Sequence, residues 1–340
     1  MTKNLALIGF GYWGPNLLRN FINIPNCNIR YCCDIDLEKL QEIKRKFPHM
    51  LTTQNYNEIL DDESIDAVIL ATPTSTHFDL AVAALNGGKD VLVEKPMVQT
   101  LQQAKILVQL AKKRGRILMV DHTFLFNPAV IKIKELIDKG EIGKILYIDS
   151  TRTNLGLFQK DINVIFDLAA HDFSIIQYIL GTQPKQVSTI GKSHFNNQVE
   201  VAYITASYPE DIFAHIHVSW ISPVKVRRML ITGTKKMIVY DEDTAPAEKI
   251  RVYDKGVTLD HPARSIEQIK IGYRTGDVWL PKIDIVEPLS LMAKSFVVSI
   301  TSRKVLRSDG RFGSEIIKIL ETASNSLKKG TKVKDANSFS

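Results

Sequence analysis

A glycine-rich turn between an expected strand and an expected helix constrains this chain more than any other feature. Residues 9–14 read Gly-Phe-Gly-Tyr-Trp-Gly, after the apolar run 5–8 and before a helical pattern that extends to Phe21. In such a turn the first glycine permits a tight bend, the second admits a pyrophosphate and the third lets helix and strand pack closely. The free amides at the helix start favour phosphate. The predicted cofactor contacts in this turn are Gly9, Phe10, Gly11, Tyr12, Trp13 and Gly14.

An acidic residue completes the pattern. Asp34 follows the next apolar stretch, residues 28–33, at the distance expected for the carboxylate that binds an adenosine ribose. Its negative charge would repel a 2′-phosphate, and the residues that follow at once, Ile35 and Asp36, supply no arginine. The sequence therefore favours NAD over NADP.

Strand and helix patterns alternate up to residue 122. Apolar runs at 67–71, 90–94 and 117–120 read as buried parallel strands, with helical segments between them. The run at 67–71 opens into a small polar loop, placed to flank the nicotinamide side of the cofactor. Ala71, Thr72, Pro73 and His77 are the predicted contacts there, although His77 fits the start of the next helix better than a reacting group.

The strand at 90–94 ends in Glu94, Lys95 and Pro96. Ligands in doubly wound sheets sit beyond the carboxyl ends of the strands, so a lysine there faces the crevice. Pro96 restricts Lys95 to an extended backbone. Taken alone, the segment fits a strand with a solvated lysine somewhat better than a functional lysine.

Beyond residue 122 the pattern changes. Strand-like alternation recurs at 145–153, 186–193, 199–207, 212–220 and 226–232, and amphipathic helices are expected at 287–300 and 312–327. Neighbouring strands of this kind predict a large, mostly antiparallel open sheet, whose free face is covered by helices or used to form a homodimer or homotetramer. We therefore predict an α/β protein with a dinucleotide-binding domain at 1–122 and a substrate-binding and oligomerisation domain at 123–340, whose final helix packs back on the first.

One helical segment, residues 161–180 with Gly181 as its stop, carries an acid and an imidazole. Asp167 and His171 are four residues apart and share a helix face, and Asn163 extends that face. A carboxylate fixes the tautomer of an imidazole and strengthens it as a base, as removal of a hydroxyl proton requires. A structural ion pair explains the segment equally well.

Substrate contacts are expected before this helix. Residues 152–160 should border the pocket, where Arg152 and Lys160, together with Lys225 or Arg227, could pair with a carboxylate or a diphosphate. This pattern suggests an anionic substrate, such as a nucleotide-linked sugar, but a set of solvated surface charges explains it equally well. The predicted substrate-binding residues are Lys95, His122, Arg152, Asn154, Asn163, Asp167 and His171.

Composition excludes several other classes. The 44 Lys and Arg against 37 Asp and Glu give a net charge of +7, but they are spread out, without zinc-finger or RNA-recognition motifs, so nucleic acid is not an expected partner. No window approaches 18 apolar residues in a row, so no membrane helix is expected. His215 and His217 share a face without a third ligand, so no metal is predicted. Three cysteines do not make a disulfide framework and fit a cytoplasmic protein.

These residues together resemble the Gfo/Idh/MocA family of sugar oxidoreductases over essentially the whole chain. The matching residues are Gly9 to Gly14, Asp34, Ala71-Thr72-Pro73 with His77, Glu94-Lys95-Pro96, Asn127-Pro128, and Asp167 with His171 and Asp172. The resemblance implies that Lys95 contacts the substrate oxygen and that His171 is the general acid/base, oriented by Asp167. It implies cofactor contacts by Glu94 and Lys95, and a cis peptide before Pro96.

The expected function is NAD-dependent hydride transfer to or from a hydroxyl or keto carbon of a sugar, free or nucleotide-linked. Two alternatives stay open. One is a redox-assisted glycoside hydrolase that retains NAD, and the other is a non-catalytic sugar or NAD sensor on the same fold. The presence of Lys95, Asp167 and His171 together argues against the sensor.

Overall fold

The computed structural model describes residues 2–259, 271–304 and 307–329. They fall into two compact units, the first built from residues 1–127 and 286–321 and the second from 128–285 and 322–340. The expected boundary after residue 122 thus moves to residue 127. The segment 123–340 is not one continuous unit, because α8 (Pro288–Ser302) and the beginning of α9 (Gly310–Lys329) belong to the first.

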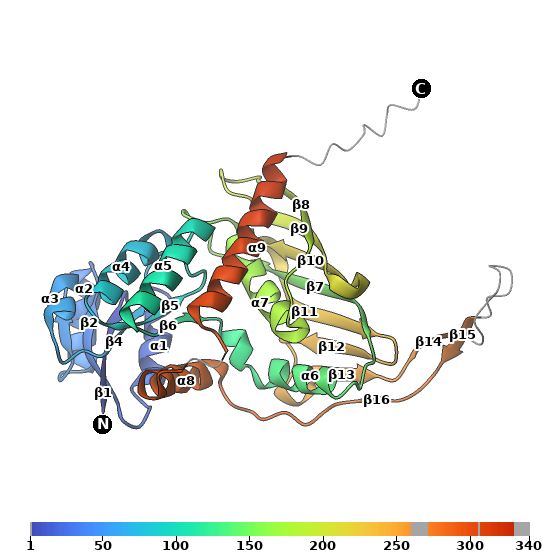
Figure 1. Ribbon diagram of the computed structural model, residues 1–340, viewed down its shortest axis with the longest axis horizontal. Helices are drawn as coiled ribbons and strands as arrows, with labels where there is room; N and C mark the ends of the chain where they lie inside the picture. The colour runs from blue at the N-terminus through green and yellow to red at the C-terminus, as the bar shows by residue number, and fades with distance from the viewer. Residues whose placement is uncertain (1, 260–270, 305–306, 330–340) are drawn as a thin grey trace. The chain divides into compact units, whose positions relative to one another are not determined.

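The first unit is organised around a six-stranded parallel sheet in the order β3-β2-β1-β4-β5-β6 (Figure 1). Strands β4 and β5 are buried along their whole length, as expected for parallel strands that are covered on both faces. The strand order reverses between β1 and β4. The strands are β1 (Lys3–Ile8), β2 (Cys27–Cys33), β3 (Leu51–Thr53), β4 (Ala67–Leu70), β5 (Asp90–Glu94) and β6 (Leu118–Asp121).

Helices connect these strands, and capping residues mark where α5 begins and ends. Thr100 accepts the amide of Gln103 at the start of α5, and Gly115 ends that helix in the left-handed conformation at φ 62°. The helices are α1 (Gly14–Phe21), α2 (Leu37–Lys46), α3 (Tyr56–Asp61), α4 (Thr74–Asn86) and α5 (Leu101–Arg114), followed by the 3₁₀ turn η1 (Thr123–Phe126).

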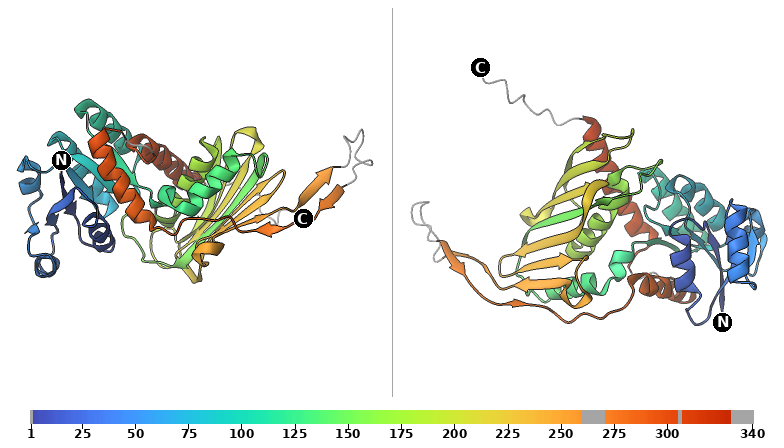
Figure 2. Two further views of the ribbon diagram at one scale, coloured as in Figure 1. Left: turned by 90° about the horizontal axis from the view of Figure 1, so that it is seen from below. Right: turned by 180° about the vertical axis from the view of Figure 1, so that it is seen from behind.

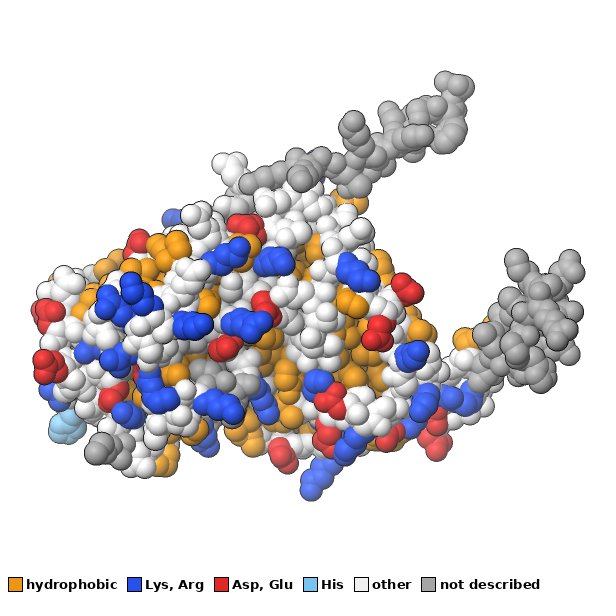
Figure 3. Space-filling view, in the orientation of Figure 1, with side chains coloured by type: hydrophobic (Ala, Val, Ile, Leu, Met, Phe, Trp, Pro, Cys, Tyr) orange, Lys and Arg blue, Asp and Glu red, His pale blue; other side chains and the backbone are white. Residues whose placement is uncertain are grey.

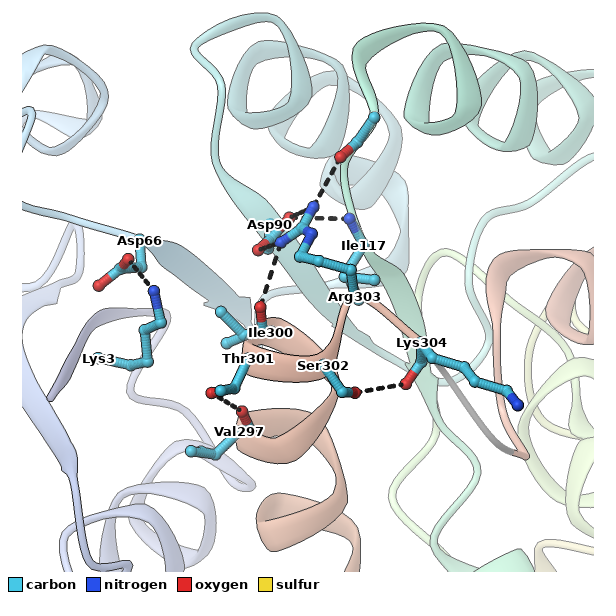
Figure 4. A network of polar contacts seen from close by, with 11 residues as sticks. Lys3, Asp66, Asp90, Ile117, Val297, Ile300, Thr301, Ser302, Arg303 and Lys304 are labelled. Carbon is cyan, nitrogen blue, oxygen red and sulfur yellow. Dashed lines mark hydrogen bonds and ion pairs between the residues drawn. The ribbon is translucent and has the colours of Figure 1, made fainter. Parts of the chain in front are cut away.

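A buried carboxylate attaches the end of α8 to the sheet of the first unit. Asp90, at the start of β5, receives two hydrogen bonds from Arg303, of 2.5 and 3.0 Å, and one from the amide of Ile117 at 2.8 Å. Arg303 also donates to the carbonyl of Gly115 (Figure 4). The pair is bidentate, which is the strongest geometry for an arginine and a carboxylate.

The second unit contains an eight-stranded sheet in the order β16-β13-β12-β11-β7-β10-β9-β8. Among its described strand pairs only β7 with β10 is parallel, so the sheet is mixed but mostly antiparallel. Its strands are β7 (Ile145–Leu155), β8 (Gln186–Lys192), β9 (Val201–Ser207), β10 (Phe213–Ser219), β11 (Ile221–Gly233), β12 (Met237–Asp241), β13 (Ile250–Tyr253) and β16 (Val278–Trp279). A separate hairpin pairs β14 (Gly256–Leu259) with β15 (Ile271–Arg274).

Helices cover one face of this sheet and leave the other uncovered by helices (Figure 2). The covering helices are α6 (Pro128–Asp138) and α7 (Ala170–Leu180), preceded by the π-helical turn η2 (Ile165–Ala169). The remaining 3₁₀ turns are η3 (Pro209–Asp211) and η4 (Pro246–Glu248). Cross-strand register places Tyr147, Tyr203 and Phe213 together on the uncovered face, each 42–49% exposed.

Charged side chains of both signs are visible on one face of the molecule. On the face shown in Figure 3, lysine and arginine side chains lie among acidic and apolar ones and do not gather in one patch. In the part of the chain that the structure describes, no helix is long and apolar enough to cross a bilayer. The same residues hold no group of three or more His, Cys, Asp or Glu side chains arranged for a metal.

Replacing Asp90 by asparagine should lower the free energy of unfolding by about 1–3 kcal/mol, because the buried carboxylate is the charged acceptor of Arg303, whose side chain is 43% exposed, and of the Ile117 amide. Urea unfolding of Asp90→Asn against the wild type measures this. The control is Lys3→Met, which breaks the pair with Asp66 at 2.8 Å, whose carboxylate is 28% exposed against 2% for Asp90 (Figure 4). That variant should lose about 1 kcal/mol or less, and equal losses in the two variants would contradict the account.

Candidate active site

The glycine turn of the first unit has the geometry of a phosphate cradle. Gly9 lies at φ +93°, and a Cβ there would meet the carbonyl oxygen of Ala71 at 2.6 Å, while a Cβ on Gly14 would meet the oxygen of Gly9 at 2.6 Å. By contrast, the space around Gly11 is open to 4 Å. Helix α1 starts at Gly14 without a side-chain cap, so its first amides are available to an anion. The turn therefore fits the pyrophosphate of a dinucleotide.

Asp34 lies just beyond β2 and belongs to the same cradle. Its Oδ2 accepts the amide of Phe10 at 2.6 Å and its Oδ1 accepts that of Asp36 at 2.9 Å. A carboxylate oxygen can accept more than one hydrogen bond, so the group can also receive ribose hydroxyls. Lys39 approaches it at 4.0 Å. The contact between Asp34 and the turn fixes both elements that the sequence assigned to the cofactor.

The loop after β4 is held in place by a buried histidine. His77, in α4, places Nε2 2.9 Å from the carbonyl of Thr72 and Nδ1 3.1 Å from that of Pro96. The side chain therefore joins the loop of Ala71 to Pro73 to the segment that follows β5. Both ring nitrogens face backbone oxygens, which gives His77 a role in positioning the loop, and its cofactor contact stays a prediction.

Lys95 is placed by the end of β5 and is partly exposed, whereas Glu94 and Pro96 on either side of it are buried. The peptide between Lys95 and Pro96 is cis. The lysine charge acts on Glu94, Asp121 and His122, so these four residues form one cluster at the carboxyl ends of β5 and β6.

Two buried carboxyl groups face each other in this cluster. Glu94 pairs with Asp121 across β5 and β6, and Asp121 also accepts the hydroxyl of Thr123 at 2.5 Å. Burial, followed by the charge of Asp121, raises the pKa of Glu94 well above its usual value. Two neighbouring buried carboxylates cannot both ionise at low cost, so the pair favours the protonated form of Glu94. The sequence analysis did not anticipate Asp121.

His122 follows Asp121 and is buried edge-on against the ring of Phe312, with 5.6 Å between ring centroids. Burial, with a smaller effect of the Lys95 charge, lowers the pKa of His122 to about 3, so the imidazole stays neutral. Neither ring nitrogen has a hydrogen-bond partner within the described residues. The substrate contact predicted for His122 stays a prediction.

The second unit carries the other predicted catalytic residues. Asp167 lies in the π-helical turn η2, and His171 lies at the start of α7. The helix ends at Gly181, in the left-handed conformation at φ 67°, as the sequence predicts. Single π turns inside helices occur frequently at functional sites. Asp167 and His171 are both partly exposed.

Trp220, directly after β10, is a neighbour of Asp167 that sequence reasoning missed. Its indole Nε1 donates to Asp167 Oδ2 at 2.9 Å, and the side chain is almost fully buried. The hydrogen bond orients the carboxylate from the sheet side. The only sequence signal was an indole at the end of an expected strand, and nothing in the pattern linked it to a residue 53 positions earlier.

Two of the predicted substrate contacts, Arg152 and Asn163, have partners within the chain, and their substrate roles stay predictions. Arg152 is buried and binds Asp172 through Nε and Nη2 at 3.0 and 3.2 Å, and Asp172 also accepts Ser150 Oγ at 2.8 Å. Asn163 accepts the amides of Ile165 and Phe166, each at 3.1 Å, and thus caps the helical segment. Arg152 and Asn163 thus both form hydrogen bonds within the second unit.

The other predicted substrate contacts, Asn154, Lys160 and Lys225, lie at or near the surface. Asn154 lies in β7, partly exposed, and its predicted role stays a prediction. Lys225 forms an exposed ion pair with Asp243 at 2.9 Å, so it is a weaker candidate for a substrate anion. Lys160 is exposed in the segment before η2 and remains the basic residue best placed for that purpose.

The variant Glu94→Gln should gain stability relative to the wild type as pH rises. In the folded wild type Glu94 keeps its proton above pH 4.5, the ordinary pKa of the side chain, whereas the unfolded chain releases it. The free energy of unfolding of the wild type therefore falls as pH rises above 4.5, until the pH reaches the raised pKa of Glu94 in the folded state. A neutral amide removes this dependence.

Urea unfolding at pH 4.5, 6 and 7.5 measures the difference in stability between the two proteins, which should grow with pH by at most about 1.4 kcal/mol per pH unit. A difference in the free energy of unfolding between Glu94→Gln and the wild type that is the same at all three pH values would contradict a raised pKa of Glu94. Asp66→Asn, at a half-exposed carboxylate of the same unit, serves as the control.

Comparison with known proteins follows the same division of the chain. Residues 3–122 match the family model described as "Oxidoreductase family, NAD-binding Rossmann fold". Residues 130–239 match the one described as "GFO/IDH/MocA C-terminal domain".

Several curated relatives are described as inositol dehydrogenases. A scyllo-inositol 2-dehydrogenase (NAD(+)) from Bacillus subtilis is 33% identical over 193 residues, which is 55% of this chain and 56% of the relative. An inositol 2-dehydrogenase from Salmonella typhimurium is 26% identical over 192 residues, or 55% of this chain and 57% of the relative. The matched part is thus little more than half the length of these relatives.

Solved structures share the fold over nearly the whole chain. A putative oxidoreductase from Magnetospirillum magnetotacticum superposes with a TM-score of 0.81 at 24% identity, over 95% of this chain and all of that one. A UDP-N-acetylglucosamine 3-dehydrogenase from Acidithiobacillus ferrooxidans superposes with a TM-score of 0.80 at 20% identity, over 97% of this chain and 99% of that one. Together the two matched domains, the cradle at Gly9 to Gly14 and the segment Glu94 to Pro96 show that this chain belongs to the Gfo/Idh/MocA oxidoreductase family.

Proposed function

We propose that the protein is an NAD-dependent oxidoreductase that moves a hydride between nicotinamide and a hydroxyl-bearing or keto carbon of a sugar or cyclic polyol. The observation that carries the proposal is the cluster at the carboxyl ends of β5 and β6, where Lys95 stands beside a carboxyl pair that holds one proton. Named relatives that act on inositols support the same reaction class.

NAD, when bound, accepts or returns the hydride, and the residues of the chain move the proton. His171 takes the hydroxyl proton in oxidation and returns it in reduction, with Asp167 as its orienter. Asp167 is itself held by Trp220. Lys95 stabilises the negative charge that develops on the reacting oxygen. The negative charge of the buried pair Glu94 and Asp121 attracts the positive charge of Lys95.

The variants His171→Ala and Lys95→Ala should each lower turnover by about 10²–10⁴-fold, because each removes a group that acts on the reacting oxygen. Stopped-flow or steady-state formation of reduced nicotinamide measures turnover, and calorimetry measures NAD binding, which both variants should retain. Near-normal turnover in either variant, with NAD bound normally, would remove that residue from the mechanism.

We further propose NAD over NADP as the physiological cofactor. Asp34 is largely buried beside the glycine turn, and its charge opposes the 2′-phosphate of NADP. The variant Asp34→Ser should therefore bind NADP about 10-fold more tightly and NAD about 10-fold more weakly, since each change is worth roughly 1.4 kcal/mol. Titration of both dinucleotides measures the two constants, and an unchanged preference would contradict the role of Asp34.

The uncovered face of the eight-stranded sheet is proposed as the surface that forms a homodimer or homotetramer. Its aromatic side chains Tyr147, Tyr203 and Phe213 are too exposed for the core of a lone chain. The variant Tyr203→Arg puts a charge on this face, in β9 beside the edge strand β8, and should shift the sedimentation coefficient towards that of a monomer. A wild type that already sediments as a monomer would rule the proposal out.

The finer substrate proposal is a nucleotide-linked or otherwise anionic sugar. Arg152 no longer supports it, because its guanidinium is engaged by Asp172. Support comes from the exposed Lys160 before the candidate catalytic helix. It also comes from the fold shared with a protein described as a UDP-N-acetylglucosamine 3-dehydrogenase.

A further inference from the structure

A row of aromatic side chains leads outward from Asp167 within the second unit. Trp220 donates to Asp167 at 2.9 Å, Phe158 meets Trp220 edge-on at 5.9 Å between ring centroids, and Phe195 meets Phe158 edge-on at 6.5 Å. The exposed fraction rises along the row, from 1% for Trp220 to 44% for Phe158 and 76% for Phe195. The row therefore joins a candidate catalytic carboxylate to exposed aromatic rings through one hydrogen bond and two edge-on ring contacts.

The loop that presents Phe195 is built on a buried carboxylate. Glu200 is 0% exposed. It accepts the backbone amides of His194 at 2.8 Å, Phe195 at 2.9 Å and Asn196 at 2.8 Å. Three amide donors converging on one carboxylate fix the loop and direct Phe195 outward. Full burial of a phenylalanine side chain is worth about 1.5–3 kcal/mol, and the fold forgoes most of it here.

The segment that presents Phe158 is fixed in a similar way. The amide of Gly156 donates to the carbonyl of Trp220 at 2.8 Å, and a Cβ on Gly156 would lie 2.7 Å from the indole Cδ1. Only glycine permits this close approach, which brings the chain over the indole two residues before Phe158. Lys160 is exposed in the same segment. Two aromatic rings and an ammonium group thus project from two fixed loops.

We propose that Phe158 and Phe195 form a stacking platform for the base of a nucleoside-diphosphate-linked sugar, with Lys160 pairing with its diphosphate. This rests on the proposed function, since the platform would hold the part of the substrate that does not react. Stacking of a base on an aromatic side chain is worth about 1–3 kcal/mol and tolerates any base. An ammonium group is a common partner for phosphate oxygens. Continuity with Asp167 through Trp220 assigns the platform to the substrate of that site.

The test uses the full chain saturated with NAD, so that the dinucleotide cradle is filled. Calorimetry with UDP, dTDP, GDP, CDP and ADP, each alone, and with inorganic pyrophosphate measures binding to the wild type and to variants. At least one nucleoside diphosphate should bind. Phe195→Ala should weaken that binding about 10-fold or more and leave pyrophosphate unchanged, while Phe195→Trp should restore it.

Lys160→Gln should weaken the nucleotide and pyrophosphate alike. The matched control is Tyr273→Ala, which removes another highly exposed aromatic ring, 80% exposed in β15, and should change nothing. The platform is wrong if no nucleoside diphosphate binds, or if Phe195→Ala binds one as tightly as the wild type does. It is equally wrong if Phe195→Ala changes only the sedimentation coefficient, because the rings would then be a contact between copies of the chain.

A parallel assay of NAD reduction with free sugars separates this inference from the proposed function. Reduced nicotinamide formed from free sugars, without any nucleotide binding, would leave the redox function in place and overturn the platform. Phe195-dependent nucleotide binding without NAD reduction by any sugar would support the platform and overturn the redox function.

Discussion

Parallel pairing in the first unit brings the residues of its candidate site to one edge of the sheet. Strands β1, β2, β4, β5 and β6 all run the same way, so the residues after them lie at their common carboxyl edge. These residues are the glycine turn, Asp34, the loop of Ala71 to Pro73, and the cluster of Glu94, Lys95, Asp121 and His122. The reversal of strand order between β1 and β4 opens the crevice there. Each further contact, such as His77 between Thr72 and Pro96, stiffens a loop at that edge.

Electrostatics at this edge follow from burial. Glu94 and Asp121 lie on adjacent strands with almost no exposure, so a protonated Glu94 is the low-energy arrangement. His122, equally buried, stays neutral. The cluster therefore keeps the ammonium of Lys95 as its cationic member, beside a single negative charge. A lysine in that setting suits a reaction in which charge develops on an alcohol oxygen.

Much of this could be predicted from the sequence, because the signals were local. Gly9 to Gly14, Asp34 and the strand ending at Lys95 depend on short stretches with well-defined turn chemistry, and the helix ending at Gly181 depends on one residue type. What could not be predicted depends on partners distant in the sequence. The alternation of apolar and polar residues predicted that Arg152 lies on a strand, but not that it binds Asp172. Nothing in the sequence marked Trp220 as the hydrogen-bond donor to Asp167. The three-residue strand β3 and the parallel pairing of β7 with β10 gave no readable pattern.

Hydride transfer between a sugar carbon and nicotinamide is the activity that we propose for this chain. The most direct measurement incubates the wild-type protein and NAD with free and nucleotide-linked sugars and follows reduced-nicotinamide absorbance together with the release of free sugar. The account predicts that reduced nicotinamide accumulates with at least one sugar and that the sugar becomes its keto form. Release of a sugar from a glycoside with no net reduction of NAD would contradict it and would instead indicate redox-assisted hydrolysis.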